Sequence, residues 1–265
     1  MIPLVLNFPD IDPIAIQLGP LAIRWYALSY ITGIVLGWVY MRGLARRKPV
    51  FTTPVAVDDY VVWATLGIVL GGRLGYVLFY NFDYYSQNPL QALYLWQGGM
   101  AFHGGFLGVV LATYLFARRR KIGPIQLGDL VAMTAPIGLF FGRLANFANG
   151  ELFGRQSDVA WAVIFPGGGD VPRHPSQLYE AVLEGLVLFL LLFVLDRTTR
   201  IREKPGTLIG LFFAGYGLAR FGVEFVRQPD AHLGTLALGL SMGQWLSIPM
   251  ILAGAGIVSW AQRRT

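Results

Sequence analysis

The stretch from Tyr60 to Tyr80 reads YVVWATLGIVLGGRLGYVLFY, and Arg73 is its single charged residue. A helix that crosses a bilayer needs about 20 consecutive, largely apolar residues, so this stretch predicts a membrane span. The sequence contains six further stretches of this kind, and together they predict an all-α polytopic membrane protein with seven transmembrane helices. The six are Leu21–Met41, Gly99–Ala117, Leu127–Phe147, Leu178–Leu195, Thr207–Val226 and Met242–Trp260.

The composition of the whole chain excludes an ordinary soluble protein. Apolar residues make up 55% of the 265 residues, charged residues only 14%, and the mean hydropathy is +0.54. A soluble domain carries about 25% charged residues. The chain has no cysteine, so it has no disulfide, no thiolate metal ligand and no cysteine nucleophile of its own. Its three histidines are scattered, so we predict no metal site and no cofactor.

Basic residues predict the direction of the helices. Lysines and arginines are enriched in cytoplasmic loops, and 14 of the 21 in this chain follow the first, third, fifth and seventh predicted spans. We therefore predict an outer N-terminus and a cytoplasmic C-terminus. The four groups are Arg42, Arg46, Arg47 and Lys48; Arg118, Arg119, Arg120 and Lys121; Arg197, Arg200, Arg202 and Lys204; and Arg263 and Arg264.

The segments between spans predict the domain organisation. Residues 1–20 contain four prolines and lack a basic start, which is untypical of a cleaved signal peptide, so we expect an extended arm on the outer face. Residues 149–177 are rich in glycine and proline and are expected to form a small outward-facing head. The predicted division is then 1–20 arm, 21–148 helices one to four, 149–177 head and 178–262 helices five to seven.

Seven arginines lie outside the basic groups, and the predicted orientation puts each of them in an outer half-span or on the outer face. An arginine inside a bilayer is costly and usually faces a partner or a wet cavity. Guanidinium groups bind phosphate with two parallel hydrogen bonds, so the pattern indicates a pocket for a lipid phosphate. Snorkelling or structural ion pairing is the alternative for each of them: Arg24, Arg73, Arg143, Arg155, Arg173, Arg220 and Arg227.

Two of these arginines have polar neighbours on their own helices. Arg143 shares a helix face with Asn146 and Asn149, and Glu151 follows within reach of an arginine. Arg220, Glu224 and Arg227 are similarly spaced i, i+4 and i+7, with a plain i,i+4 salt bridge as the alternative. Both patterns favour a polar site at the outer ends of two spans.

His103 is the one histidine inside a predicted span, and Gly98, Gly99, Gly104 and Gly105 surround it. An imidazole can accept a proton near neutral pH, and the glycines would leave space for a substrate. A hydrogen-bonded packing role is equally compatible with this pattern. The sequence shows no Ser-His-Asp elbow, no phosphate-binding glycine loop and no face for nucleic acid.

These residues resemble a known family along the whole chain, the bacterial phosphatidylglycerol–prolipoprotein diacylglyceryl transferases. Six blocks occur in the family's order, with one departure at Ala145, where the family more often has glycine. The blocks are RWY at 24–26, GRLGY at 72–76, GMAFHGG at 99–105, Gly142 to Glu151, HPSQLYE at 174–180, and Arg220 to Asp230 with Glu224, Arg227 and Pro229.

The resemblance implies transfer of the sn-1,2-diacylglyceryl group from phosphatidylglycerol to the lipobox cysteine thiol of a preprolipoprotein. The product would be a thioether, in the first step of lipoprotein maturation. The enzyme would lie in the inner membrane, with its head and active site towards the periplasm. Its partners would be this lipid, the preprolipoprotein signal peptide and the bilayer.

The resemblance also assigns roles to individual residues. His103 would be the base for the thiol, Arg143 and Arg220 would bind the phosphate, and Glu224 and Glu151 would orient arginines. The catalytic set is thus His103, Arg143, Arg220 and Glu224. The substrate-binding set is Arg143, Tyr26, Asn146, Asn149, Glu151, Gly154, Arg73 and Arg220.

Two other functions remain open from the residues alone. A lipid or anion transporter would use the buried arginines as a pathway, but it would also need polar residues in the inner halves of the spans, which are nearly bare. A membrane scaffold or receptor would not need a histidine and arginines at one depth. A lipid-transfer assay with a lipobox peptide separates these functions.

Overall fold

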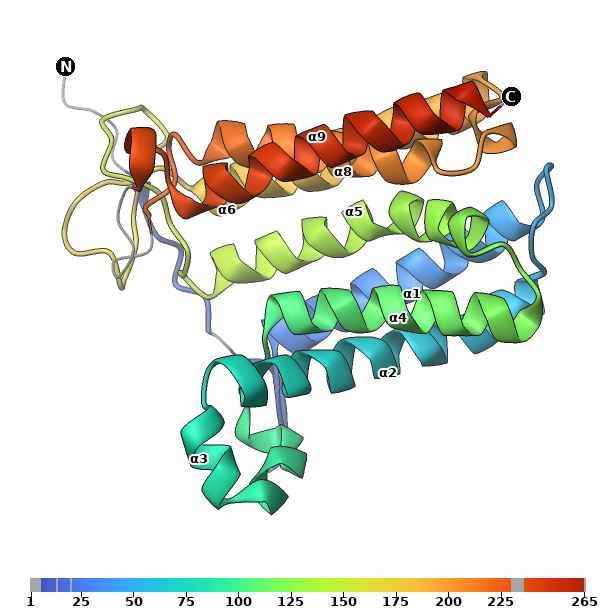
Figure 1. Cartoon of the computed structure of the whole chain (residues 1–265). Helices are drawn as coiled ribbons and strands as arrows, with labels where there is room; N and C mark the ends of the chain where they lie inside the picture. Colours follow the sequence, from blue (N-terminus) through green and yellow to red (C-terminus); the bar gives the residue numbers. More distant parts are fainter. Residues whose placement is uncertain (1–5, 13, 20, 230–235, 265) are drawn as a thin grey trace. The chain divides into compact units, whose positions relative to one another are not determined.

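The computed structural model describes residues 6–12, 14–19, 21–229 and 236–264 (Figure 1). The chain divides into two compact units. The first unit comprises residues 1–39 and 131–265, and the second comprises residues 40–130. Parts of the predicted arm (residues 1–5, 13 and 20), and Asp230 of the last sequence block, lie outside the described residues.

Helices dominate both units (Figure 1). Two of them, α1 and α5, run through the boundary between the units. The first unit also contains one continuous helix built from α6, a π-helical segment η3 and α7, followed by α8 and α9. The bounds are α1 Trp25–Ala45, α5 Pro124–Ala148, α6 Ser176–Glu180, η3 Ala181–Val187, α7 Leu188–Thr198, α8 Thr207–Val223 and α9 Met242–Arg263.

Small residues bring α8 and α9 together in the first unit. A methyl group on Gly210 would come within 2.7 Å of the Gly254 carbonyl oxygen, and one on Gly217 within 2.8 Å of Ile251 Cγ1. Packing through small residues is typical of membrane helices, because apolar side chains gain little by leaving lipid. The start of α9 is capped by Ser241 and Gln244, whose side chains bond reciprocally to each other's backbone.

The head contains short strands, and the N-terminal segment pairs with it. β1 (Leu6–Asn7) lies parallel to β4 (Val163–Ile164), with Leu6 opposite Val163. β2 (Ile14–Leu18) and β3 (Leu21–Arg24) form an antiparallel hairpin. The prediction of a helix from Leu21 is therefore wrong for its first four residues, and α1 begins at Trp25. Gly19 adopts φ +58°, so the chain reverses there and the apolar residues after it pair as a strand.

The second unit is built on two helices in very close contact, α2 (Pro54–Phe79) and α4 (Phe102–Arg120). A methyl group on Gly67 would come within 2.6 Å of the Gly108 carbonyl oxygen, and one on Gly71 within 2.9 Å of Gly108 Cα. These helices therefore need glycine where they cross. In the sequence, α2 and α4 are separated by α3 (Phe82–Gln87) and two 3₁₀ turns, η1 (Pro89–Leu93) and η2 (Leu95–Gln97).

Helical segments occupy all seven stretches that the sequence singled out. Among the described residues, five helices are long and apolar enough to cross a membrane, namely Trp25–Ala45, Pro54–Phe79, Pro124–Ala148, Ser176–Thr198 and Met242–Arg263. α8 is apolar but shorter, and α4 ends in three arginines. The protein is thus a mostly helical, multi-pass membrane protein, while seven crossings and their orientation stay predictions.

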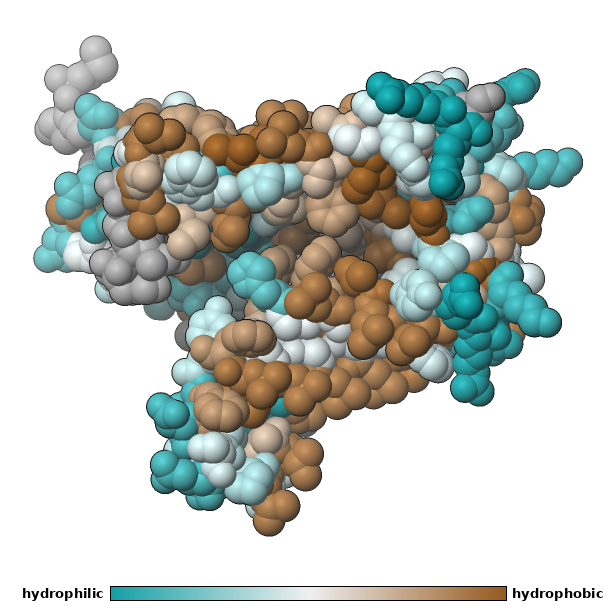
Figure 2. Space-filling view, viewed as in Figure 1, coloured by the Kyte–Doolittle hydropathy of each residue, from teal (hydrophilic) through white to brown (hydrophobic). Residues whose placement is uncertain are grey.

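The helix surfaces fit a lipid environment. Along α2, apolar side chains at i,i+4 spacing are all more than half exposed: Val62, Leu66, Leu70, Leu74 and Leu78. On the face drawn in Figure 2, apolar residues cover the middle of the helices and hydrophilic residues gather beyond their ends. Surfaces of this kind are rare on soluble proteins.

Candidate functional site

A buried carboxylate in the first unit gathers three arginines. Glu180, the last residue of α6, has a fully buried side chain. Its Oε2 lies 3.1 Å from Nη1 of Arg143, and its Oε1 accepts a hydrogen bond of 2.9 Å from Nη1 of Arg227. Nη1 of Arg220 donates to the same Oε1. Three guanidinium groups, one from α5 and two from the end of α8 and the segment after it, therefore converge on one side chain.

Two further carboxylates complete this group. Glu184 lies one turn after Glu180, and its Oε2 accepts a hydrogen bond of 3.2 Å from Nη2 of Arg143. Glu224 pairs with Nη2 of Arg220 and accepts a hydrogen bond of 2.5 Å from the Ser241 hydroxyl. We call Arg143, Arg220, Arg227, Glu180, Glu184 and Glu224 the arginine cluster. Its three positive and three negative charges balance.

Burial within the arginine cluster is uneven. The side chains of Glu180 and Glu184 are 0% exposed and that of Glu224 is 3% exposed, whereas those of Arg143 and Arg220 are each 17% exposed. The carboxylates therefore form the floor of the cluster, and the guanidinium groups keep an accessible edge. An anionic ligand would reach the arginines before the glutamates.

Local structure explains how these residues meet. Helix α8 ends at Val223, so Glu224 lies in the turn that follows and Arg227 lies beyond the helix. The predicted span to Val226 was thus too long by three residues. Arg227 instead forms an antiparallel bridge with Gly154. On the other side, a methyl group on Gly185 would come within 2.6 Å of Phe140 Cβ, so this glycine lets the π segment approach α5.

Gly154 joins three segments beside the arginine cluster. Its N–H donates to the His174 carbonyl at 2.8 Å. A Cβ at this position would lie 2.5 Å from the Val226 carbonyl oxygen and 2.7 Å from His174 Cβ. The predicted substrate-binding residue Gly154 therefore lies where the head meets the segment after α8, and the space admits no side chain.

A second polar group lies at the start of α1 and the end of α5. The Asn146 amide donates to the Tyr26 hydroxyl at 2.8 Å and to Glu151 Oε1 at 2.9 Å. Asn149 donates to the same Glu151 oxygen at 3.4 Å, and Gln177 donates to the Glu151 carbonyl at 2.5 Å. Glu151 was expected to orient an arginine, but in the structure its side chain orients these two carboxamides.

His174 forms a small hydrogen-bonded group with Tyr179 and Trp161 at the head. Its Nδ1 lies 3.1 Å from the Tyr179 hydroxyl, which also accepts a hydrogen bond of 2.6 Å from the Trp161 indole. Burial lowers the pKa of His174, because desolvation disfavours the charged imidazolium. His174 is therefore a neutral hydrogen-bonding residue at neutral pH.

Arg73, in the second unit, is engaged by the loop that precedes α4. Its side chain is buried, and its guanidinium lies 5.1 Å from the centre of the Tyr85 ring. The donors bond to loop carbonyls, including Nε to Ala92 at 2.8 Å and Nη2 to Gln91 at 2.8 Å. Another nitrogen, Nη1, donates to the Gly98 carbonyl. These contacts give Arg73 a structural role through backbone carbonyls, whereas the alternative foreseen was an ion pair or snorkelling. The predicted role in substrate binding stays a prediction.

His103 lies in the first turn of α4 in the second unit, with an exposed side chain. The space around His103 is smaller than the four neighbouring glycines predicted. Gly99 faces the ring of Tyr76, and a methyl group on Gly104 would come within 2.9 Å of Gly75 Cα. Helix packing therefore uses Gly104, and only Gly98 opens onto free space among the described atoms. The role of His103 as a base stays a prediction.

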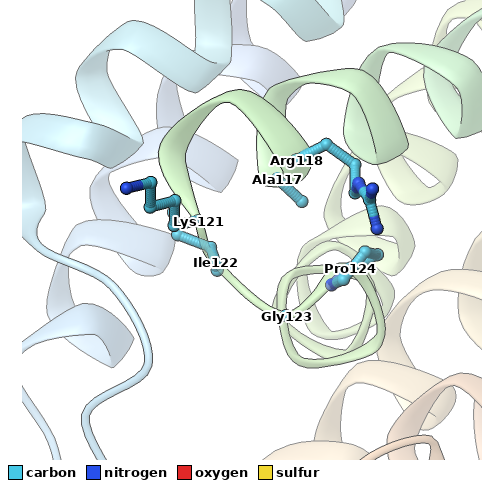
Figure 3. Close-up of a pocket in the computed structure, with 6 residues that line it drawn as sticks. All are labelled: Ala117, Arg118, Lys121, Ile122, Gly123 and Pro124. Atoms are coloured by element: carbon cyan, nitrogen blue, oxygen red, sulfur yellow. The ribbon is translucent and has the colours of Figure 1, made fainter.

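A separate cavity of about 450 Å³ lies at the other end of α4 (Figure 3). It is lined by Ala117, Arg118, Lys121, Ile122, Gly123 and Pro124. Figure 3 shows the side chains of Arg118 and Lys121 extending away from each other. The cavity contains none of the predicted site residues, and about 22 Å of helix separates Arg118 from His103 at 1.5 Å per residue.

Sequence reasoning missed Glu180, Glu184 and Ser241. Glu180 was read only as part of a block of residues, and Glu184 was counted within an apolar span. A usable signal was present, because three arginines inside a bilayer require counter-charges. Two glutamates at i,i+4 spacing within the span that begins near Leu178 were the available ones.

Comparisons with a family model and with known proteins identify the same family. The family model for prolipoprotein diacylglyceryl transferase matches residues 13–260. A protein of Paramagnetospirillum magneticum is 61% identical over 260 residues, which cover 98% of this chain and 97% of that protein. A protein of Rhodospirillum rubrum is 60% identical over 260 residues, which cover 97% of this chain and 95% of that protein. Both carry the name phosphatidylglycerol–prolipoprotein diacylglyceryl transferase.

Proposed function

Because the chain belongs to the prolipoprotein diacylglyceryl transferase family, it is a transferase acting on phosphatidylglycerol and a prolipoprotein, and we propose that its arginine cluster binds the phosphate of that lipid. One observation carries the proposal: Arg143 and Arg220 are held by buried carboxylates and still keep an exposed edge. A fixed guanidinium offers parallel donors that match a phosphate.

The charge change in the reaction fits this placement. The bond that breaks joins a diacylglycerol carbon to a phosphate oxygen, and the electron pair stays on the phosphate. The departing glycerol phosphate thereby gains negative charge. Donors that already surround the phosphate stabilise this charge without rearrangement, which is the strongest general form of catalysis by a fixed environment. Arg143 and Arg220 are assigned this role.

The acceptor in this proposal is the thiol of a lipobox cysteine. The sulfur forms a bond to the diacylglyceryl carbon, and the thiol proton must leave. A free thiol has a pKa of about 8.5 and is mostly protonated at neutral pH, so a base accelerates the step. His103 is assigned as this base. The chain itself has no cysteine, so the acceptor supplies the only thiol.

The second polar group is assigned to the lipid headgroup. Tyr26, Asn146 and Glu151 form one hydrogen-bonded set in the first unit, and Asn149 extends it. Such groups can bond to glycerol hydroxyls or to the developing intermediate. Gly154 supports this set by holding the head close to the segment after α8.

The proposed location is the bacterial inner membrane, with the chain crossing the bilayer several times. The head and the arginine cluster then face the periplasm. Support comes from the 14 basic residues at the opposite ends of the helices. The proposed domain division follows the same orientation, with an arm, four helices, a periplasmic head and three helices.

The test is transfer by purified protein. Phosphatidylglycerol labelled in its acyl chains is mixed with a lipobox peptide, and mass spectrometry follows the peptide. We expect a peptide carrying a diacylglyceryl thioether, and none with a peptide in which serine replaces the cysteine. Lipid movement across vesicles without any peptide modification would favour the transporter. Arg143→Gln with unchanged transfer would contradict the proposed phosphate site.

A further inference from the structure

The arginine cluster is electrically complete before any lipid arrives. Its three arginines are balanced by Glu180, Glu184 and Glu224. A phosphodiester has one acidic group and enters as a monoanion, so it would leave the cluster with one negative charge in excess. An uncompensated charge in a poorly hydrated site is costly, and buried groups commonly neutralise instead. Uptake of one proton restores the balance.

The three carboxylates differ in how well they are held. Glu180 contacts all three arginines. Glu224 pairs with Arg220 and also accepts the Ser241 hydroxyl hydrogen bond. Glu184 has Arg143 as its single hydrogen-bond donor among the described residues. Its second oxygen, Oε1, is buried and has no hydrogen-bond partner in the described part of the chain. One oxygen of Glu180 and one of Glu224 also lack a hydrogen bond, but each of those lies in an ion pair with an arginine, whereas the ion pair of Glu184 runs through its other oxygen.

Glu184 and the proposed lipid phosphate would use the same hydrogen-bond donor, Nη2 of Arg143. Nη2 of Arg143 reaches Glu184 at 3.2 Å, while Nη1 of the same guanidinium stays with Glu180 at 3.1 Å. The Arg143 side chain is partly exposed and the Glu184 side chain is fully buried. A phosphate that approaches the exposed edge therefore competes with Glu184 for Nη2, and Glu184 cannot follow Arg143 into water.

Local structure isolates Glu184 further. It lies in the π-helical segment Ala181–Val187, a departure from α-helix that is often found at functional sites. The groups that face it electrostatically are Arg143 on α5, Glu180 on its own helix, and Arg220 and Tyr216 on α8. The neighbouring carboxylate of Glu180 opposes a second negative charge once Nη2 of Arg143 binds the phosphate instead of Glu184.

We propose that Glu184 is the exchangeable carboxylate of the cluster: the lipid phosphate displaces it from Arg143, and Glu184 takes up one proton as phosphatidylglycerol binds. This inference rests on the proposed phosphate site at Arg143. No bond other than that to the proton changes, and the proton comes from solvent. The purpose of the exchange is to hold Arg143 in place without lipid while keeping the loaded cluster neutral.

The proposal predicts a pH dependence of lipid affinity. When binding takes up one proton, affinity falls by up to about tenfold for each unit of rising pH. In this proposal Glu184 is ionised in the free protein, so the sign is weaker binding at alkaline pH. Glu184→Gln resembles the protonated residue. The variant should bind the lipid as tightly as wild type at low pH and more tightly than wild type at high pH. Its own lipid affinity should change by less than about twofold between these two pH values.

The experiment measures phosphatidylglycerol binding by calorimetry, with the purified full chain in detergent and no peptide, so that no turnover occurs. Titrations in buffers of different ionisation enthalpy count the protons taken up per lipid. We expect close to one for wild type and for Glu203→Gln, which removes an exposed glutamate outside the cluster, and close to zero for Glu184→Gln. If Glu184→Gln does not fold, Glu184→Met provides an apolar side chain of similar size.

A wild-type measurement decides the proposal without any variant. Infrared difference spectra on adding lipid should gain a band of a protonated carboxyl group, identified by its shift in D₂O, which the ester carbonyl bands of the lipid do not show. Phosphatidylglycerol that binds with no proton uptake by wild type, or with the same uptake by Glu184→Gln, overturns the inference and leaves the proposed function intact. Failure of wild type to bind or transfer the lipid would instead contradict the proposed function.

Discussion

At the scale of single residues, the two-pronged form of Arg143 explains its place in the arginine cluster. Its Nη1 and Nη2 reach two different carboxylates, Glu180 and Glu184, at 3.1 and 3.2 Å. A planar group with several donors at fixed angles is well suited to hold both at once. The same geometry would present two donors to a phosphate, so the shape of the residue matters as much as its charge.

Arg143→Lys tests this reasoning. Lysine retains the positive charge but presents one compact ammonium group, which cannot bridge the two carboxylates and a phosphate. We expect transfer activity to fall at least about tenfold, equivalent to roughly 1.4 kcal/mol of transition-state stabilisation. The control is Arg197→Lys at an exposed position near the end of α7, which should leave turnover unchanged. Equal activity of both variants would make Arg143 a general positive charge.

His103→Gln tests the proposed base. Glutamine keeps a hydrogen-bonding side chain but cannot accept a proton near neutral pH, and general-base catalysis is worth about 10²–10⁴-fold. The deficit should shrink between about pH 6.5 and 9.5, since the thiol ionises by itself around its pKa of about 8.5. Turnover against wild type across this range is the measurement, with lipid binding followed in parallel.

His174→Gln is the matched control for that experiment. Burial lowers the pKa of His174, so this imidazole stays neutral above its ordinary value of about 6.5. Any deficit of His174→Gln should therefore be constant across the range. A constant deficit of His103→Gln, or one that follows lost lipid binding, would make His103 a ligand or a packing residue.

At the scale of elements, the contact between α2 and α4 depends on glycine. Gly71→Ala adds a methyl group within 2.9 Å of Gly108 Cα, and overpacking of this kind costs about 1–3 kcal/mol. We expect a lower unfolding temperature in detergent. Gly43→Ala on α1 meets no atom within 4 Å and should be neutral or stabilising, since alanine favours helix by about 1 kcal/mol over glycine. A Gly71→Ala protein as stable as Gly43→Ala would show that the helices adjust.

The helices could be predicted from apolar runs, but their ends could not. Leu21–Arg24 is as apolar as the helix that follows, and it forms a strand because the turn at Gly19 folds it against Ile14–Leu18. The residue types of the arginine cluster were partly predictable, since Arg143 and Arg220 are conspicuous inside spans. Their partners Glu180 and Glu184 lie about 40 residues away in sequence, and only the packing of α5, α8 and the π segment identifies them.

At the scale of the whole molecule, the proposed chemistry uses residues of both units. The arginine cluster and the set around Asn146 belong to the first unit, and His103 belongs to the second. Helices α1 and α5 run through the boundary between the units. The predicted direction of the spans would place the start of α1, the start of α4 and the end of α5 on one side of the membrane, which the proposed function requires.

Reporter fusions test that direction. Basic groups begin at Arg42, Arg118 and Arg197, and the positive-inside rule keeps such loops in the cytoplasm. Fusions after Lys48, Lys121 and Lys204 should therefore all report a cytoplasmic position, and a fusion at the exposed Asp170 of the head should report the opposite side. An outer signal after Lys121 alone would be the most damaging result. It would reverse α4 and move His103 to the cytoplasmic face, away from the head, so that one membrane face could no longer contain both the base and the phosphate site.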